Sequence, residues 1–159
     1  MSATARTEYY DDPAAPAPNS LVVATSAVVT DSRGRILLQR RADSGNWALP
    51  GGAMEMDESL ADSVVREVRE ETGYDIEVTG LVGTYTDPRH IIAYTDGEVR
   101  RQFNICYTAR ITGGELAISS ESTELRFVAP GELDGLQMHP TQRLRLRHYF
   151  DRDGQPYLG

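Results

Sequence analysis

The chain has 159 residues and a mass of 17.6 kDa, which predicts one domain whose core is large enough to fold without a disulfide or a structural metal. Hydrophobic residues make up 40% and charged residues 25%, and no apolar run approaches the ~18 residues of a membrane span. The net charge of −8 argues against nucleic acid as a partner. Cys106 is the only cysteine, which excludes an internal disulfide and a cysteine-based zinc cluster.

The first twenty residues differ in composition from the rest of the chain. They include the stretch "PAAPAP" and few residues to bury, so we expect residues 1–20 to be a flexible or partner-pairing segment. They also lack the basic start and apolar run of a signal peptide, which favours a cytoplasmic protein. The domain is expected over residues 21–151, and residues 152–159 form a C-terminal tail.

The next part of the chain predicts strands. Residues 21–30 and 35–41 are rich in Val, Leu and Ile and predict a hairpin closed by a turn at residues 31–34. Residues 42–53 predict a loop with a short extended piece at 47–49.

The clearest helix is predicted over residues 57–72. Asp57 is a suitable N-cap, and Gly73 stands where a left-handed residue ends a helix. Apolar side chains recur at helical spacing and form one stripe, at Leu60, Ala61, Val64, Val65, Val68 and Thr72.

The remainder of the chain is mostly strands followed by a terminal helix. Strands are predicted at residues 76–85, 90–95, 98–112, 116–119 and 125–128. The helix at residues 139–151 is expected to turn Leu144, His148 and Tyr149 inward. This order predicts an α/β fold in which a mixed sheet is flanked by helices.

Three glutamates on the first helix are not explained by folding. Glu67, Glu70 and Glu71 stand at i, i+3 and i+4, so their carboxylates share one face and repel one another. They also lie in the C-terminal half, where the helix dipole disfavours negative charge. A bound cation would remove this conflict, and carboxylates without His or Cys suit Mg²⁺ or Mn²⁺. The alternative is a solvated acidic face.

The wider spacing resembles the Nudix box. Residues 52–74 read "GAMEMDESLADSVVREVREETGY" and agree with that signature at its fixed positions, except that Tyr74 stands where an aliphatic residue is preferred. The resemblance implies a Nudix-type α/β/α sandwich. It also implies an enzyme that hydrolyses a nucleoside diphosphate linked to another moiety, by attack of water on a metal-bound pyrophosphate.

The resemblance also implies roles for residues of the box. Glu67, Glu70 and Glu71 match the metal ligands, and the carbonyl of Gly51 matches a backbone ligand. Arg66 matches the arginine that holds a box glutamate in place. Glu58 matches a glutamate that supports the loop or contacts a metal through water. The implied cofactor is Mg²⁺, with Mn²⁺ as a substitute.

The general base is left open between a box glutamate and an acid of a later loop. Glu121 and Glu124 are the loop candidates, and we favour Glu121 because it lies farther from the strand at residues 125–128. Solvation of a turn is the alternative role for both.

Residues that could contact substrate are predicted from charge and aromatic character. All sixteen basic residues are arginine, so a phosphate contact here must use the planar guanidinium. Arg40, Arg41 and Arg89 are the candidates for the anionic part of a nucleotide. Trp47 and Phe103 are candidates for stacking on a base, although strand aromatics often belong to the core. His90 is a weak candidate for a metal ligand, because it lacks a His or Cys partner.

A single residue, Pro88, bears on the identity of the substrate. Pro88 lies fifteen residues after Gly73, which resembles a mark of ADP-ribose pyrophosphatases, and tilts the prediction towards ADP-ribose or a related nucleotide sugar. The alternatives are a house-cleaning (d)NTP pyrophosphohydrolase and a non-catalytic nucleotide-binding regulator. No membrane or nucleic-acid partner is expected. Relatives that pair through N-terminal strands imply a possible homodimer.

Overall fold

The computed structural model of the protein describes residues 5–159. Its strands are β1 (Arg6–Tyr10), β2 (Ser20–Thr30), β3 (Ile36–Arg41), β4 (Trp47–Ala48), β5 (Gly51–Ala53), β6 (Tyr74–Tyr85), β7 (His90–Tyr94), β8 (Val99–Gly114), β9 (Ser122–Val128) and β10 (Tyr157–Leu158). Its helices are α1 (Leu60–Thr72), the 3₁₀ helix η1 (Pro130–Gly135) and α2 (Pro140–Asp151). No helix within residues 5–159 combines the length and apolar character that crossing a membrane requires.

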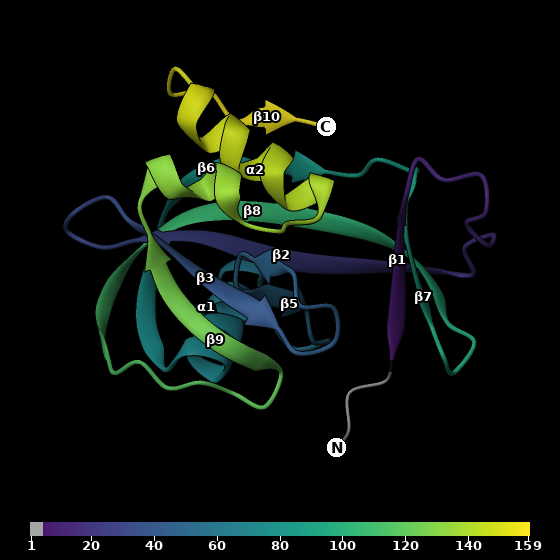
Figure 1. The fold of residues 1–159 in the computed structure, drawn as a ribbon, viewed down its shortest axis with the longest axis horizontal. Coiled ribbons are helices and arrows are strands. Elements are labelled where there is room, and N and C mark those ends of the chain that lie inside the picture. The colour runs from purple at the N-terminus through teal and green to yellow at the C-terminus, as the bar shows by residue number, and fades with distance from the viewer. Residues whose placement is uncertain (1–4) are drawn as a thin grey trace.

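The strands form one mixed, curled sheet. Its continuous order is β1-β7-β8-β2-β3-β4, and β5, β6, β9 and β10 branch from this path. The centre is a long parallel pair, β2 with β8, which runs from Ser20 opposite Arg100 to Thr30 opposite Arg110. Helices α1 and α2 lie on opposite sides of the sheet (Figure 1). The prediction of a mixed sheet flanked by helices is confirmed.

Alternate residues of the central strands pack into two apolar layers. Val28 of β2 belongs to the layer that includes Leu146 of α2. Its neighbour Val29 belongs to the layer that includes Val64 of α1. Because both faces of this part of the sheet are covered, β2 and β3 are apolar on both sides, which explains why they were recognisable as strands.

The N-cap of helix α1 lies two residues later than the sequence suggested. It is Ser59, not Asp57, and Ser59 forms a capping box with Asp62. The hydroxyl of Ser59 accepts a hydrogen bond from the Asp62 N–H at 3.1 Å. Two capping residues stand close together here, and the reciprocal partner three positions on selects the second one. Gly73 ends the helix in the left-handed conformation, as predicted.

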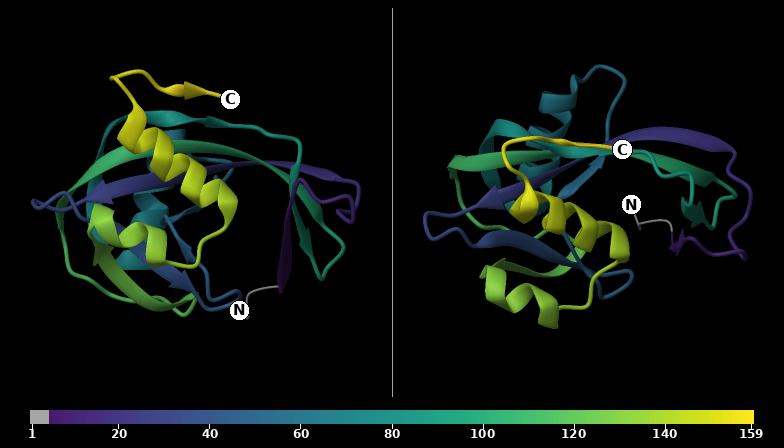
Figure 2. Two further views of the ribbon diagram at one scale, coloured as in Figure 1. Left: turned by 45° about the horizontal axis from the view of Figure 1, so that its top comes forward. Right: turned by 90° about the horizontal axis from the view of Figure 1, so that it is seen from above.

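Strands are present at residues 6–10 and 157–158, within the two segments that were predicted to be tails. Residues 6–10 form β1, which pairs antiparallel with β7 of the same chain, from Arg6 opposite Tyr94 to Tyr10 opposite His90. Figure 2 shows β1 beside β7 at one end of the sheet. β10 pairs with β6. Dimerisation stays a prediction, and the N-terminal pairing seen here is within one molecule.

One predicted strand is absent, and the inward face expected for α2 is found only in part, since Tyr149 packs against the core. Residues 116–119 form no strand, although the strands predicted at 76–85, 90–95, 98–112 and 125–128 are present close to their expected ends. Helix α2 buries Thr141, Arg145 and Leu146, whereas Leu144, His148 and Tyr149 are only partly buried. The apolar pattern of α2 is weak, so tertiary contacts decide which of its faces is buried.

Gly73 provides a test of the helix end. Its φ is 81°, and a Cβ there would lie 2.1 Å from the carbonyl oxygen of Glu115. We expect Gly73→Ala to lower the free energy of unfolding by about 2 kcal/mol or more, because the left-handed conformation alone costs a non-glycine residue roughly 1–2 kcal/mol. Gly131→Ala is the matched control, since no atom lies within 4 Å of its added Cβ. Equal urea midpoints for the two variants would contradict this account.

Candidate active site

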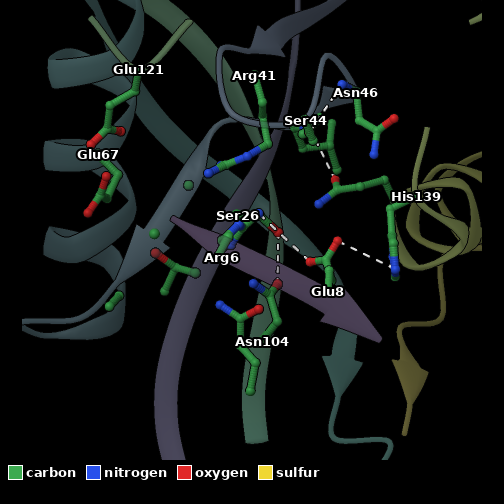
Figure 3. Close-up of a pocket in the computed structure, with 18 of the residues that line it drawn as sticks. Arg6, Glu8, Ser26, Arg41, Ser44, Asn46, Glu67, Asn104, Glu121 and His139 are labelled. Carbon is green, nitrogen blue, oxygen red and sulfur yellow. Dashed lines mark hydrogen bonds and ion pairs between the residues drawn. The ribbon is translucent and has the colours of Figure 1, made fainter. Parts of the chain in front are cut away.

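A cavity of about 240 Å³ lies where α1, the loop around β5 and strand β1 come together. Figure 3 shows Glu67 and Glu121 at one end of the cavity and His139 at the other. β1 passes across it and carries Arg6 and Glu8. Elements from both halves of the chain therefore build this cavity.

Glu71 is the most buried acid of the site, with 4% of its surface exposed. One of its carboxylate oxygens, Oε2, accepts hydrogen bonds from Gln39 Nε2 at 3.0 Å and from the Gly51 N–H at 2.9 Å. Burial and the nearby charge of Glu67 raise the pKa of Glu71 to about 8, outweighing the bond from Gly51. The structure thus holds in place a carboxylate that is costly to ionise.

Arg66 binds three other acids, two of them on α1 and one just before it. Its Nη1 donates to Glu67 at 3.0 Å and to Glu70 at 3.2 Å, while Nε and Nη2 bind the carboxylate of Glu58. Glu67 lines the cavity, whereas Glu58 and Glu70 do not. The structure therefore places Arg66 in contact with Glu67, and it brings Glu58 and Glu70 to Arg66 instead of to the cavity wall.

The loop before α1 passes very close to its neighbours. A Cβ on Gly51 would lie 2.1 Å from the carbonyl oxygen of Thr25, and a Cβ on Gly52 would lie 2.6 Å from the carboxylate of Glu67. Both residues line the cavity. Glycine at position 51 lets the loop pass close to the backbone of β2, and glycine at position 52 lets it approach the carboxylate of Glu67 on α1.

Glu121 comes to the same end of the cavity from the turn before β9. Its charge contributes to the raised pKa values of both Glu71 and Glu67. Glu124 instead pairs with Arg126 at 3.0 Å. Of the two loop acids considered from the sequence, only Glu121 lines this cavity.

The donor set fits a hard divalent cation. Glu67, Glu71 and Glu121 offer carboxylate oxygens to one space. Among residues 5–159, no ion pair within 4.0 Å involves Glu71 or Glu121, and the charge of Arg41 acts on Glu71 only from beyond that distance. A cation at this position would relieve both the mutual repulsion and the cost of burial.

The predicted substrate contacts divide into two groups. Arg41 and Trp47 line the cavity, and Arg41 is held by Asp43 through bonds of 2.9 and 2.8 Å. Trp47 is 5% exposed and is also part of the core. These two residues remain candidates for binding substrate.

The structure does not bring the other three candidates to this cavity. Arg40 is exposed and donates to the carbonyl oxygen of Gly45. Arg89 pairs with Asp87 in the turn before β7. Phe103 lies between two cavity-lining residues of β8, so the alternation of a strand turns it to the opposite face.

The far end of the cavity holds a cluster that the sequence did not predict. Glu8 of β1 lies 3.2 Å from His90 Nε2 and 3.4 Å from His139 Nε2. His90 therefore has a histidine partner, contrary to expectation, but the two residues are far apart in the chain and no local pattern connects them. Burial opposes ionisation of Glu8, yet its bond with His90 and the charges of His139 and Arg6 lower its pKa to about 2.

The ligand atoms of Glu8, His90 and His139 lie within 4.8 Å of one another, a spacing that also suits a metal ion, but the surroundings of the cluster favour hydrogen bonding. His139 Nδ1 lies 2.8 Å from the Thr141 hydroxyl and 3.3 Å from the Thr141 N–H at the start of α2, which turns Nε2 towards Glu8. Arg6 and Arg145 also line this end of the cavity, and their charges disfavour a second cation. Glu8 thereby fastens β1 to β7 and to α2.

Comparison with known proteins identifies the family. Residues 20–152 match the description "NUDIX domain". The chain belongs to the Nudix family. Its relatives include a MutT-like protein of Streptomyces ambofaciens, 37% identical over 133 residues that cover 83% of this chain and 79% of the relative.

Two other Nudix proteins extend the comparison. The nucleoside triphosphatase NudI of Escherichia coli is 30% identical over 122 residues, or 72% of this chain and 86% of the relative. The crystal structure of an ADP-ribose pyrophosphatase from Streptococcus suis has a TM-score of 0.65 at 25% identity, covering 87% of this chain and 98% of that one. The expected Nudix fold and the assignment as a Nudix pyrophosphohydrolase are confirmed.

Glu71→Gln tests the electrostatics of the Nudix site without metal. Because the carboxyl pKa is raised from 4.5 to about 8 on folding, the stability of the metal-free protein falls as pH rises between these values. Glutamine cannot ionise, and its amide oxygen can accept the two bonds that Glu71 Oε2 accepts. In EDTA at pH 9 we expect the thermal midpoint of the variant to lie about 2–4 °C or more above that of the wild type. This shift corresponds to a gain of roughly 1 kcal/mol in the free energy of unfolding.

The same measurement at pH 6 serves as the internal control. There Glu71 is already protonated, so the two thermal midpoints should lie closer together than at pH 9. A difference that does not grow with pH would contradict the raised pKa.

Proposed function

We propose that this protein catalyses the Mg²⁺-dependent hydrolysis of a nucleoside diphosphate linked to another moiety, with ADP-ribose or a related nucleotide sugar as substrate. The observation that carries the proposal is the group of cavity carboxylates, Glu67, Glu71 and Glu121, without a basic partner for Glu71 or Glu121 among residues 5–159. A diphosphate is itself an anion, and it can approach this group only together with a cation.

Each residue of the site has a proposed part. Glu67 and Glu71, with the carbonyl of Gly51, would hold Mg²⁺, and Glu70 would join them by leaving Arg66. Bound Mg²⁺ supplies neutralisation of the diphosphate charge and orients the attacking water. Arg66 keeps Glu67 in place, and Arg41 donates to the phosphate oxygens.

Glu121 is the proposed general base. It stands at the metal end of the cavity and is not engaged in an ion pair within the described part of the chain. It would accept the proton of the attacking water as the bond from phosphorus to the bridging oxygen breaks.

The tilt towards ADP-ribose rests on the name of the Streptococcus suis enzyme and on Pro88. Pro88 lies in an exposed turn away from the cavity, so it does not act on substrate directly. The second candidate is a nucleoside triphosphate pyrophosphohydrolase, which the name of the Escherichia coli relative favours.

A substrate panel with separated products tests the proposal. With Mg²⁺, ADP-ribose should yield AMP and ribose 5-phosphate, and EDTA should stop the reaction. Release of pyrophosphate from dNTPs, with ADP-ribose inert, would favour the second candidate. Glu71→Gln should abolish turnover while the variant stays folded, and near-normal turnover of this variant would reject the metal site.

Glu121→Gln tests the base. We expect kcat to fall by about 10²–10⁴-fold, the usual contribution of a general base. Glu124→Gln is the matched control in the same segment and should leave kcat unchanged, because Glu124 pairs with Arg126 outside the cavity. Equal effects of the two substitutions would remove Glu121 from this role.

A further inference from the structure

Arg145 is a buried charge that lines the cavity without an ion-pair partner. It comes from α2 and is 3% exposed. Within residues 5–159 its guanidinium makes no hydrogen bond or ion pair, and its Nε is wholly buried without a partner. Burying a charge in this state is costly, so folding alone does not explain it.

Neighbouring groups offset this cost only in part. The guanidinium lies 5.4 Å from the centre of the Tyr85 ring, a cation–π contact. Glu8 is a cavity acid at the same end, but His90 and His139 engage its two oxygens. The other three arginines of the cavity each have an acidic partner: Arg6 pairs with Glu8, Arg41 with Asp43 and Arg100 with Glu98.

Two amides beside this region have their acceptor atoms occupied by the protein. Gln142 Oε1 accepts the Leu49 N–H at 3.1 Å, and Asn104 Oδ1 accepts the Ser26 hydroxyl at 2.8 Å. Both residues line the cavity, and within the described part of the chain neither NH₂ group has a partner. Together with Arg145 they offer unpaired N–H donors to a ligand.

We propose that Arg145, Gln142 and Asn104 form a subsite for a second anionic group, a phosphate or a carboxylate, carried by the substrate away from the scissile diphosphate. This inference rests on the proposed function, which places the diphosphate at Glu67, Glu71 and Glu121. The substrate class is then a nucleoside diphosphate derivative with an additional negative charge. A planar guanidinium and two amide donors match the oxygens of such a group.

Matched substrate pairs test the subsite and distinguish its two possible ligands. UDP-glucose and UDP-glucuronate differ by a carboxylate, and ADP-ribose and its 2′-phosphate differ by a phosphate. The wild type should favour the more anionic member of one pair by about tenfold or more in kcat/KM, as a charge-assisted hydrogen bond predicts. The pair that shows the preference identifies the group.

Variants then assign the preference to Arg145. Arg145→Met should remove it by lowering kcat/KM for the more anionic member by about tenfold more than for the less anionic member, and Arg145→Lys should restore part of it. Arg147→Met is the control, because Arg147 lies on the exposed face of the same helix. No preference in the wild type, a preference that survives Arg145→Met, or an equal loss for both members would overturn the subsite.

Asn104→Asp provides a test that does not depend on removing the buried charge. It keeps an acceptor for the Ser26 hydroxyl but replaces the amide donor by a carboxylate. We expect it to weaken the anionic member selectively by about tenfold. An unchanged preference would count against the subsite even if Arg145→Met failed to fold.

A binding measurement separates the subsite from the proposed function. Calorimetric titration with inorganic phosphate in EDTA should show millimolar binding to the wild type and to Arg147→Met, and none to Arg145→Met. If none of the four substrates is hydrolysed, the proposed function fails, and this titration still decides the subsite. No phosphate binding to the wild type would overturn it.

Discussion

Glu71 is held in an environment that opposes its own charge. It is 4% exposed, and burial together with the charges of Glu67 and Glu121 raises its pKa. Gln39 and Gly51 nevertheless donate to it, which fixes its position before any ligand arrives. Ionised Glu71 therefore lowers the free energy of unfolding of the metal-free protein. A cation bound next to this carboxylate would remove that cost.

The fold places the carboxylates of Glu67, Glu71 and Glu121 at one end of a cavity and a group of basic and amide side chains at the other. The parallel pair of β2 and β8 runs the length of the molecule and carries Ser26 and Asn104 in its middle. Helix α2 adds Arg145, and β1 crosses the opening with Arg6 and Glu8. One end therefore gathers carboxylates, whereas the other combines the basic and amide side chains with the single carboxylate of Glu8.

Several elements were predictable from local sequence. The strands around Val28 and the helix that contains Val64 have strong apolar patterns, because both pack against the sheet core. Strand β1 was missed, since the five residues "RTEYY" bury little by themselves and gain their partner, β7, from about eighty residues away. The start of α1 was misplaced because Asp57 and Ser59 are both suitable caps.

The sequence by itself determined that Glu67, Glu70 and Glu71 share a helix face, because the i, i+3 and i+4 spacing follows from helix geometry. The tertiary structure decided which of them faces the cavity, since the packing of α1 turns Glu67 and Glu71 inward and leaves Glu70 with Arg66. It also decided that Arg145 is buried. Such positions depend on contacts between segments far apart in the chain, which no local pattern encodes.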